Sequence, residues 1–177
     1  MIFQIILQAL YYFFPAYIAN MTPPVLKFIP LNKPIDCGKK IGGKRIFGKH
    51  KTFRGFFGAV IVGTLIFYLQ GLLLSTTFFS NISIIKYDNL WLGLLLSLGA
   101  ITGDLIKSFF KRRMNIEPGK SWIPFDQLDF VIGAFIFSMW VFLPSIQIII
   151  IIFLLTPILQ MIAHYSGYIL KLNEDKI

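Results

Sequence analysis

The sequence predicts an all-α integral membrane protein with five transmembrane helices, and three observations support this fold class. Of its 177 residues, 56% are hydrophobic and only 14% are charged, and the mean hydropathy is +0.72. These values are outside the range of soluble globular domains. Five apolar segments each come near the roughly 20 residues that a helix needs to cross a bilayer. The Lys and Arg residues fall almost entirely in alternate connections between these segments. We therefore interpret residues 1–177 as a single membrane-embedded domain.

The first predicted helix comprises residues 1–20, which are apolar apart from two glutamines and Asn20. A secretory signal peptide is the alternative, but it requires a basic start, and no Lys or Arg precedes Lys27. We therefore expect a spanning helix here. Pro157 lies within the last predicted helix and is expected to kink it. The four further predicted helices comprise residues 56–79, 89–110, 126–143 and 145–170.

The distribution of positive charge predicts how these helices are oriented. Five spans place the connections 26–55 and 111–125 and the C-terminal tail on one side of the membrane. Counting Lys107 with the adjacent connection, and Lys171 and Lys176 of the tail, this side holds 16 Lys and Arg residues. The other side holds only Lys86. The positive-inside rule then predicts a multi-pass protein of the cell membrane with its N-terminus outside and two cytoplasmic loops that form a polar site at the membrane boundary.

Residues 98–129 bring acids and cations to this boundary. Asp104 lies in an otherwise almost wholly apolar run, where a carboxylate is costly unless it is paired. On a helix, a spacing of i, i+3, i+4 and i+7 places four polar residues on one face. These are Asp104, Lys107, Ser108 and Lys111, followed by Arg112 and Arg113, and the next apolar segment begins with Asp126 and Asp129. The pattern predicts a site for a divalent metal and a polyphosphate.

The three acids differ in how well a structural role explains them. Asp104 is alternatively a buried acid that is neutralised by Lys107 or by protonation. Asp126 is alternatively a helix N-cap after Pro124, because Asp is favoured there. Asp129 lies one turn deeper, where it has no capping role.

The basic residues also have a structural alternative, since cations at this boundary often anchor a protein to lipid headgroups. This interpretation applies most directly to Lys111, Arg112 and Arg113. The short turn at residues 117–124 adds a further cation and a hydroxyl to the same space, Lys120 and Ser121.

Composition limits the metal and the partners. The single cysteine, Cys37, excludes an intrachain disulfide, and two widely separated histidines, His50 and His164, do not favour a zinc site. Three carboxylates favour an oxygen-preferring metal, and Mg²⁺ combines one or two carboxylates with phosphate oxygens. The net charge of +9 could indicate nucleic acid binding, but in so apolar a chain cations more often face lipid headgroups or an anionic substrate. We therefore expect Mg²⁺ and no nucleic acid.

The first long connection is rich in Pro, Gly and basic residues. Its backbone amides and cations can surround a phosphate chain, and its composition excludes a long helix. Residues 43–50 match a Walker A motif except that His50 replaces the final Ser or Thr. We expect no strand before them, and therefore no P-loop. Lys51, Thr52 and Arg54 stand where the second helix begins, close to the expected position of the acids, although any single lysine of the loop is alternatively a solvated residue.

Tyr17 and Asn20 lie at the cytoplasmic end of the first predicted helix. Tyr17 is best interpreted as an interfacial aromatic residue. The amide of Asn20, beside a proline-rich exit, is expected to face the polar site.

Four motifs follow one another along the chain: PAYIAN at 15–20, GKHKTFRG at 48–55, GAITGDLIKSFFKRR at 99–113 and EPGKSWIPFDQLD at 117–129. Together they resemble the archaeal CDP-archaeol synthase family over nearly the whole chain. That family is similar to bacterial phosphatidate cytidylyltransferases, whose signature contains Ser-x-x-Lys-Arg and a later Asp-Arg-x-x-Asp. The chain lacks the His-Gly-Gly run of the bacterial enzymes, and Gln127 replaces their arginine. These differences favour the shorter archaeal enzyme.

The resemblance implies a CTP-dependent cytidylyltransferase of EC class 2.7.7. Such an enzyme transfers CMP from CTP to 2,3-bis-O-geranylgeranyl-sn-glycerol 1-phosphate, an isoprenoid glycerol ether phosphate, and gives CDP-archaeol and pyrophosphate in archaeal phospholipid synthesis. Asp104, Asp126 and Asp129 would hold Mg²⁺, and Lys111 and Arg112 would neutralise the phosphates. The remaining residues expected to bind substrate are Asn20, Lys51, Thr52, Arg54, Lys107, Ser108, Arg113, Lys120 and Ser121. Because long isoprenoid chains are costly to expose to water, the lipid is expected to enter laterally between helices.

Three other classes of function stay open, and the first is another membrane lipid enzyme. A CDP-alcohol phosphotransferase needs a longer Asp-Gly…Ala-Arg…Asp…Asp array, and a lipid phosphatase needs a histidine nucleophile with a partner. A small ion transporter would use Asp104 as its ion site, but its polar groups should follow a path through several helices, whereas here they gather at one face. A non-catalytic lipid-binding protein is supported only by the basic loop.

Overall fold

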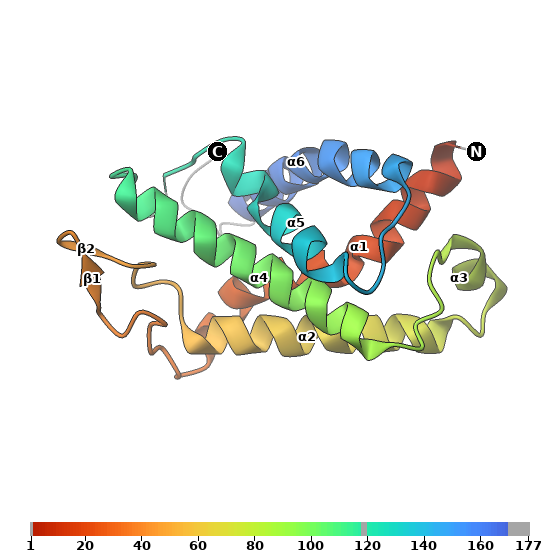
Figure 1. Ribbon diagram of the computed structural model, residues 1–177, viewed down its shortest axis with the longest axis horizontal. Helices are drawn as coiled ribbons and strands as arrows, with labels where there is room; N and C mark the ends of the chain where they lie inside the picture. Colours follow the sequence, from red (N-terminus) through yellow and green to blue (C-terminus); the bar gives the residue numbers. More distant parts are fainter. Residues whose placement is uncertain (1, 118–119, 170–177) are drawn as a thin grey trace.

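The computed structural model describes the backbone of residues 2–117 and 120–169, and side chains through residue 162 (Figure 1). Pro118 and Gly119 of the second loop, Lys171 and Lys176 of the tail and the side chain of His164 lie outside this part of the chain. The described part is mostly helical. Its elements, in order, are α1 (Ile2–Val25), the 3-10 helix η1 (Leu26–Phe28), β1 (Lys40–Ile41), β2 (Lys44–Arg45), α2 (Phe53–Leu73), α3 (Thr77–Ile82), α4 (Leu90–Arg113), α5 (Phe125–Ser138) and α6 (Ile146–Ile169).

Three helical segments of the described chain are long and apolar enough to cross a membrane: Ile2–Phe28, Phe53–Leu73 and Leu90–Arg113. Helix α5 has 14 residues, fewer than the 18 expected, because it ends at Ser138 rather than at residue 143. Helix α6 has 24 residues, Ile146–Ile169, close to the expected 145–170, and its part with described side chains, Ile146–Ile162, is apolar. The structure thus confirms a mostly helical protein with three helices that could cross a membrane. The number of five spans and the outward N-terminus stay predictions.

Helix α1 continues five residues beyond the expected end, through Pro23 and Pro24. Proline removes backbone donors and normally ends a helix. Pro23 and Pro24 leave the carbonyls of Ala19 and Asn20 without their helical N–H donors. The Thr22 hydroxyl donates to the carbonyl of Ile18 at 2.7 Å. Helix α1 thus ends at Val25, directly before the expected connection that begins at residue 26.

Helix α2 ends at Leu73, earlier than the expected residue 79. A Ser-Thr-Thr run follows, and the hydroxyls of Ser75 and Thr76 donate to the carbonyls of Leu72 and Leu73 at 3.2 and 2.9 Å. These bonds satisfy the carbonyls that a helix leaves without partners at its C-terminus. The residues beyond form the separate short helix α3.

The first loop contains a small hairpin that the sequence analysis did not expect. Strands β1 and β2 pair antiparallel, with Lys40 opposite Arg45. Gly42 and Gly43 form the turn with φ angles of 56° and 79°, which glycine adopts without a steric penalty. The hairpin precedes a loop rather than the helix of a βαβ unit, so the Walker-like residues 43–50 do not form a P-loop.

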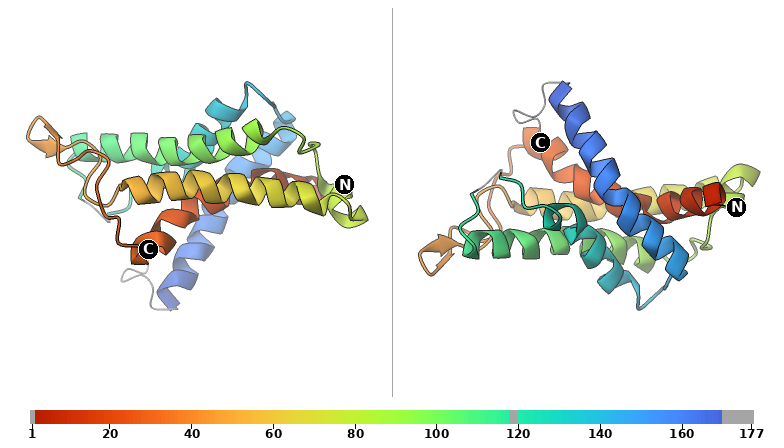
Figure 2. Two further views of the ribbon diagram at one scale, coloured as in Figure 1. Left: turned by 90° about the horizontal axis from the view of Figure 1, so that it is seen from below. Right: turned by 90° about the horizontal axis from the view of Figure 1, so that it is seen from above.

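Helix α4 is the centre of the bundle and packs against α1, α2 and α5. Figure 2 shows α2 and α4 side by side, with α6 crossing the other helices obliquely. Small residues allow α4 and α5 to approach closely: a Cβ at Gly103 would lie 2.2 Å from the carbonyl oxygen of Asp129, and one at Gly133 would lie 2.2 Å from that of Gly99. Close packing through small residues is typical of helices in membranes.

The two ends of the bundle differ in composition. The hairpin and the basic end of α4 lie at one end, and the N-terminus and α3 lie at the other (Figure 1). The expected cytoplasmic loops thus meet at one end of the bundle, where the polar site is found.

Candidate active site

The inner face of α4 carries the polar residues that the helical spacing predicted. Asp104, Ser108 and Lys111 are only 8%, 5% and 7% exposed, within a helix whose other buried residues are small or apolar. Buried charges are costly unless they are paired and hydrogen-bonded, so Asp104 and Lys111 both require partners of opposite charge or hydrogen-bonding groups.

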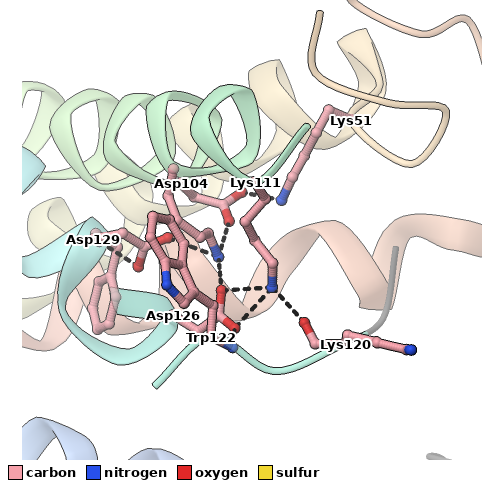
Figure 3. A network of polar contacts seen from close by, with 9 residues as sticks. Lys51, Asp104, Lys111, Lys120, Trp122, Asp126 and Asp129 are labelled. Carbon is pink, nitrogen blue, oxygen red and sulfur yellow. Dashed lines mark hydrogen bonds and ion pairs between the residues drawn. The ribbon is translucent and has the colours of Figure 1, made fainter. Parts of the chain in front are cut away.

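The ammonium group of Lys107 lies where three carboxylates converge. Its Nζ atom is 3.2 Å from Asp104 Oδ1, 3.1 Å from Asp126 Oδ1 and 2.9 Å from Asp129 Oδ2. Asp104 comes from α4, and the two other acids come from the first turns of α5. The structure therefore brings together the three acids that the sequence singled out, and it places a lysine between them. Figure 3 shows the three acids facing one another across this centre.

Asp126 and Lys111 form a second part of this network. Lys111 Nζ lies 3.0 and 2.9 Å from the two carboxylate oxygens of Asp126, and it donates to the carbonyl of Lys120 at 2.5 Å (Figure 3). The backbone N–H of Trp122 also donates to Asp126, at 2.5 Å. The position of the N-cap is Pro124 and α5 begins at Phe125, so the alternative that Asp126 is the N-cap is wrong.

The deepest acid is Asp129, whose side chain is 5% exposed. Besides its contact with Lys107, its Oδ1 accepts from the N–H of Phe130 at 2.6 Å. The close contact of Gly103 with the Asp129 backbone brings this carboxylate to the polar face of α4.

The end of the first loop reaches the same cluster. Lys51 forms an ion pair with Asp104, as expected from its place at the start of α2. The two residues predicted with it have other partners: the Thr52 hydroxyl caps α2 by accepting from the N–H of Gly55 at 3.2 Å, and Arg54 donates to the carbonyl of Lys27 at 3.2 Å. Their predicted roles in substrate binding stay predictions.

Asp36 organises the first loop, and the sequence analysis missed it. Its buried carboxylate forms an ion pair with Arg45 and accepts from the N–H groups of Gly38, Phe47 and Gly48 at 3.0, 3.3 and 3.0 Å. Burial alone would raise the pKa of Asp36, but these donors outweigh it and hold the pKa at about 2. A signal was present in the sequence, because Asp36 is the only acid before residue 88.

The two arginines at the end of α4 lie against this loop. The Arg113 guanidinium donates to the carbonyls of Ile41, Lys44 and Arg45 at 2.6, 3.1 and 2.6 Å, so it fastens the hairpin to the helix. Arg112 lies beside Gly48, where an added Cβ would be 3.8 Å from its Nε atom. We predicted that both bind substrate. Arg113 already donates to three backbone carbonyls of the hairpin. Arg112 instead lies beside Gly48, three residues before Lys51. Substrate binding by either arginine stays a prediction.

His50 stands at the position of the Walker Ser or Thr and is surrounded by three cations. Partial desolvation and the charges of Lys49, Lys51 and Arg112 lower the pKa of His50 below its usual range. These surroundings disfavour the protonated form of the His50 imidazole.

Three other predicted residues lie around the network. The Lys120 side chain is exposed and forms an ion pair with Glu117 at 3.1 Å, while its backbone carbonyl accepts from Lys111. Ser121 is exposed. Asn20 lines the cavity described next.

A cavity of about 720 Å³ opens beside the cluster, between α1, α4, α5 and α6. Asp104, Lys107 and Asp126 line its polar end, and apolar residues such as Phe14 and Leu159 line the remainder. Tyr17 also borders the cavity and is bonded to α6, since its hydroxyl lies 2.7 Å from the Thr156 hydroxyl. A space with a charged end and an apolar wall can receive an amphipathic ligand.

The three acids provide the oxygen ligands that Mg²⁺ prefers. In the part of the chain that the structure describes, no group of three or more His, Cys, Asp or Glu side chains is arranged to hold a metal ion by itself. The ammonium of Lys107 lies where Asp104, Asp126 and Asp129 converge. The donor types thus fit Mg²⁺, and the predicted site requires the Lys107 side chain to move.

Comparison with known proteins agrees with these features. A model of the CarS-like CDP-archaeol synthase family matches residues 2–176. The CDP-archaeol synthase of Methanocaldococcus jannaschii is 36% identical over 177 residues, covering 98% of each chain. That of Pyrococcus horikoshii is 40% identical over 173 residues, covering 97% of this chain and 96% of the relative.

A solved structure of similar fold is described as an intramembrane enzyme for archaeal membrane lipids biosynthesis. It matches with a TM-score of 0.71 and 27% sequence identity, and the match covers 93% of this chain and 94% of that one. The family match and the relatives each extend over nearly the whole length. This chain therefore belongs to the CDP-archaeol synthase family.

Proposed function

We propose that this protein transfers CMP from CTP to an isoprenoid glycerol ether phosphate at the cluster of three acids and three lysines. The observation that carries the proposal is the position of this cluster at the end of a largely apolar cavity. The charged groups suit phosphates, and the apolar wall suits the lipid chains. The family match supports the same reaction.

In this reaction an oxygen of the lipid phosphate attacks the α-phosphorus of CTP. A P–O bond to that phosphorus forms, the bond between the α-phosphorus and the bridging oxygen to the β-phosphorus breaks, and pyrophosphate leaves with the electron pair. No covalent intermediate with the protein is needed, so the side chains contribute positioning and charge neutralisation.

The residues of the cluster would divide these tasks. Lys111 is held by Asp126 and by the backbone carbonyl of Lys120, and presents a fixed positive charge on the side of the site next to the second loop. Lys51 approaches from the first loop, and Arg112 approaches from the end of α4 beside Gly48 of that loop, where both can contact the triphosphate. Asp104, Asp126 and Asp129 would hold Mg²⁺, which supplies positive charge toward the negative charge that develops on the phosphates.

The cavity gives the lipid a route from the membrane. Its wall includes the side chains of Phe14 and Met21 of α1 and Leu159 of α6, which are 43%, 53% and 36% exposed. An acceptor lipid entering between α1 and α6 would keep its chains in the apolar part and bring its phosphate to the acids. Because the basic loops lie at the same end, we infer that this end faces the cytoplasm in the cell membrane.

The proposal is tested by identifying both products. Purified protein receives Mg²⁺, the lipid phosphate and CTP labelled with ³²P at the α-phosphate. The expected result is a labelled CDP-lipid together with one equivalent of unlabelled pyrophosphate. Label that stays water-soluble, or an unlabelled lipid product, contradicts the proposed transfer. GTP in place of CTP tests the nucleotide preference.

A further inference from the structure

Lys107 differs from the two other lysines of the cluster in the number of acids that it contacts. Lys51 pairs with Asp104, and Lys111 pairs with Asp126. Lys107 contacts all three acids at 2.9 to 3.2 Å, and within the described residues it is the cation paired with Asp129. Its ammonium thus lies at the point that the oxygen ligands of a shared cation would surround.

The charges of this cluster are balanced without any added ion. Three carboxylates face three ammonium groups, and all six side chains are at most 28% exposed. A divalent metal that entered alone would leave two positive charges uncompensated in a poorly solvated site, which is costly. A nucleoside triphosphate carries roughly four negative charges at neutral pH, so a metal that enters with the nucleotide avoids this excess.

The Lys107 side chain has space into which it can move. It borders the cavity of about 720 Å³ between α1 and α6, and also a groove of about 410 Å³ between α4 and α5. The groove is lined mainly by apolar residues, including Phe110 and Ile132. A lysine has a flexible stem and a head with three rotatable donors, so it can leave the carboxylates and contact a phosphate nearby.

We propose that Lys107 occupies the metal position of the free protein and leaves it only when the nucleotide arrives. The metal then binds together with CTP rather than before it. This inference rests on the proposed function, since it assumes that the cluster binds CTP and Mg²⁺. The inference adds that the metal does not bind before CTP, and it attributes this order of binding to the Lys107 side chain.

The test measures metal binding rather than turnover. Mn²⁺ serves as a paramagnetic substitute for Mg²⁺, and the free ion is quantified by electron paramagnetic resonance in purified protein. Each variant is titrated without nucleotide and with a CTP analogue whose α–β bridge is a methylene group, which prevents CMP transfer. Mn²⁺ bound by the analogue alone is measured without protein and subtracted, because triphosphates chelate Mn²⁺ in solution. We expect the wild type itself to bind Mn²⁺ at least tenfold more tightly with the analogue than without it.

Two variants at Lys107 separate its role from that of the other cations. Lys107→Met removes the ammonium and should bind Mn²⁺ without nucleotide at least tenfold more tightly than the wild type does. Lys107→Gln keeps a polar head without charge and should behave in the same way, which covers the case that the Met variant does not fold. Lys49→Met, at an exposed position in the loop, is the matched control and should resemble the wild type.

Two outcomes would overturn the inference. One is equal Mn²⁺ affinity of the wild type with and without the analogue. The other is affinity without nucleotide that is as weak in a folded Lys107 variant as in the wild type. Either result in a protein that still transfers CMP refutes only this inference, whereas a wild type without CMP transfer refutes the proposed function.

Discussion

Lys51, the second residue before α2, forms an ion pair with Asp104, fifteen residues into α4. Charged groups from the first loop and from a membrane helix therefore meet inside the bundle. The loop is itself fastened at two points, by Asp36 within it and by Arg113 from the end of α4. The position of Lys51 thus depends on contacts that lie well outside the site.

Asp36→Asn should loosen the first loop, because it removes the charge that pairs with Arg45. At neutral pH we expect trypsin to cleave this variant after Lys39 and Lys40 several-fold faster than the wild type. Asp88→Asn changes an exposed acid and is the control, with an unchanged rate. Equal cleavage of the Asp36 variant and the wild type would show that the carboxylate does not hold the loop.

The same carboxylate predicts a dependence on pH. The pKa of Asp36 in the folded protein is about 2, below its unfolded value of about 4. A lowered folded pKa stabilises the folded state fully above the unfolded value, and this contribution is lost as the pH falls toward the folded value. The protection of the Gly48 amide from hydrogen exchange, corrected for intrinsic rates, should therefore persist above pH 4 and fall between about pH 4 and 2. Protection that is constant over this range would contradict the assignment.

Gly103→Ala should separate α5 from α4, because the new Cβ would meet the backbone carbonyl of Asp129 at 2.2 Å. Backbone yields less readily than a side chain, and overpacking costs about 1–3 kcal/mol. We expect a lower melting temperature and at least a tenfold loss of CMP transfer. Gly58→Ala is the matched control, since its Cβ meets only the Leu26 side chain, whose flexible terminal Cδ1 is the nearest atom at 2.1 Å, and its stability should change by less than about 0.5 kcal/mol. A Gly103 variant as stable and active as the control would show that this contact is not critical.

The orientation is tested by cysteine labelling in intact cells. With Cys37 replaced by alanine, single cysteines are introduced at the exposed positions of Lys49 and Lys86. We expect a reagent that cannot cross membranes to label the position of Lys86 only. Labelling at the position of Lys49 alone would mean that the topology is inverted.

Local spacing was sufficient to predict the face of α4. Residues Asp104, Lys107 and Lys111 are related by helical periodicity, which depends only on their separation along the chain. The proximity of Asp126 and Asp129 to this face could also be predicted, because a short connection brings the ends of successive helices together. Helix ends were predicted less well: α1 continues through Pro23 and Pro24, and the hydroxyls of Ser75 and Thr76 bond to the last carbonyls of α2.

The partners of the charged residues could not be predicted from local pattern. Lys107 was expected to bind substrate, yet it lies among the acids because Gly103 allows α5 to approach α4. Arg113 was expected at the phosphates, yet three carbonyls of a hairpin some 70 residues earlier accept from it. Such pairings depend on contacts between segments that are distant in the sequence.

The central claim is that three acids together hold the metal ion needed for CMP transfer. Asp→Asn variants at Asp104, Asp126 and Asp129 test this claim most directly. Asn keeps the size of the side chain and removes its charge. If the acids hold Mg²⁺ against the CTP phosphates, each variant should lose several kcal/mol of transition-state stabilisation. At about 1.4 kcal/mol per tenfold, CTP turnover should fall roughly a hundredfold or more.

The decisive measurement is the CTP turnover of purified Asp129→Asn beside its melting temperature, because this acid has no capping role and contacts Lys107 most closely. We predict turnover reduced about a hundredfold or more in a protein that remains folded. Near-normal turnover in the Asp129→Asn variant would contradict the site.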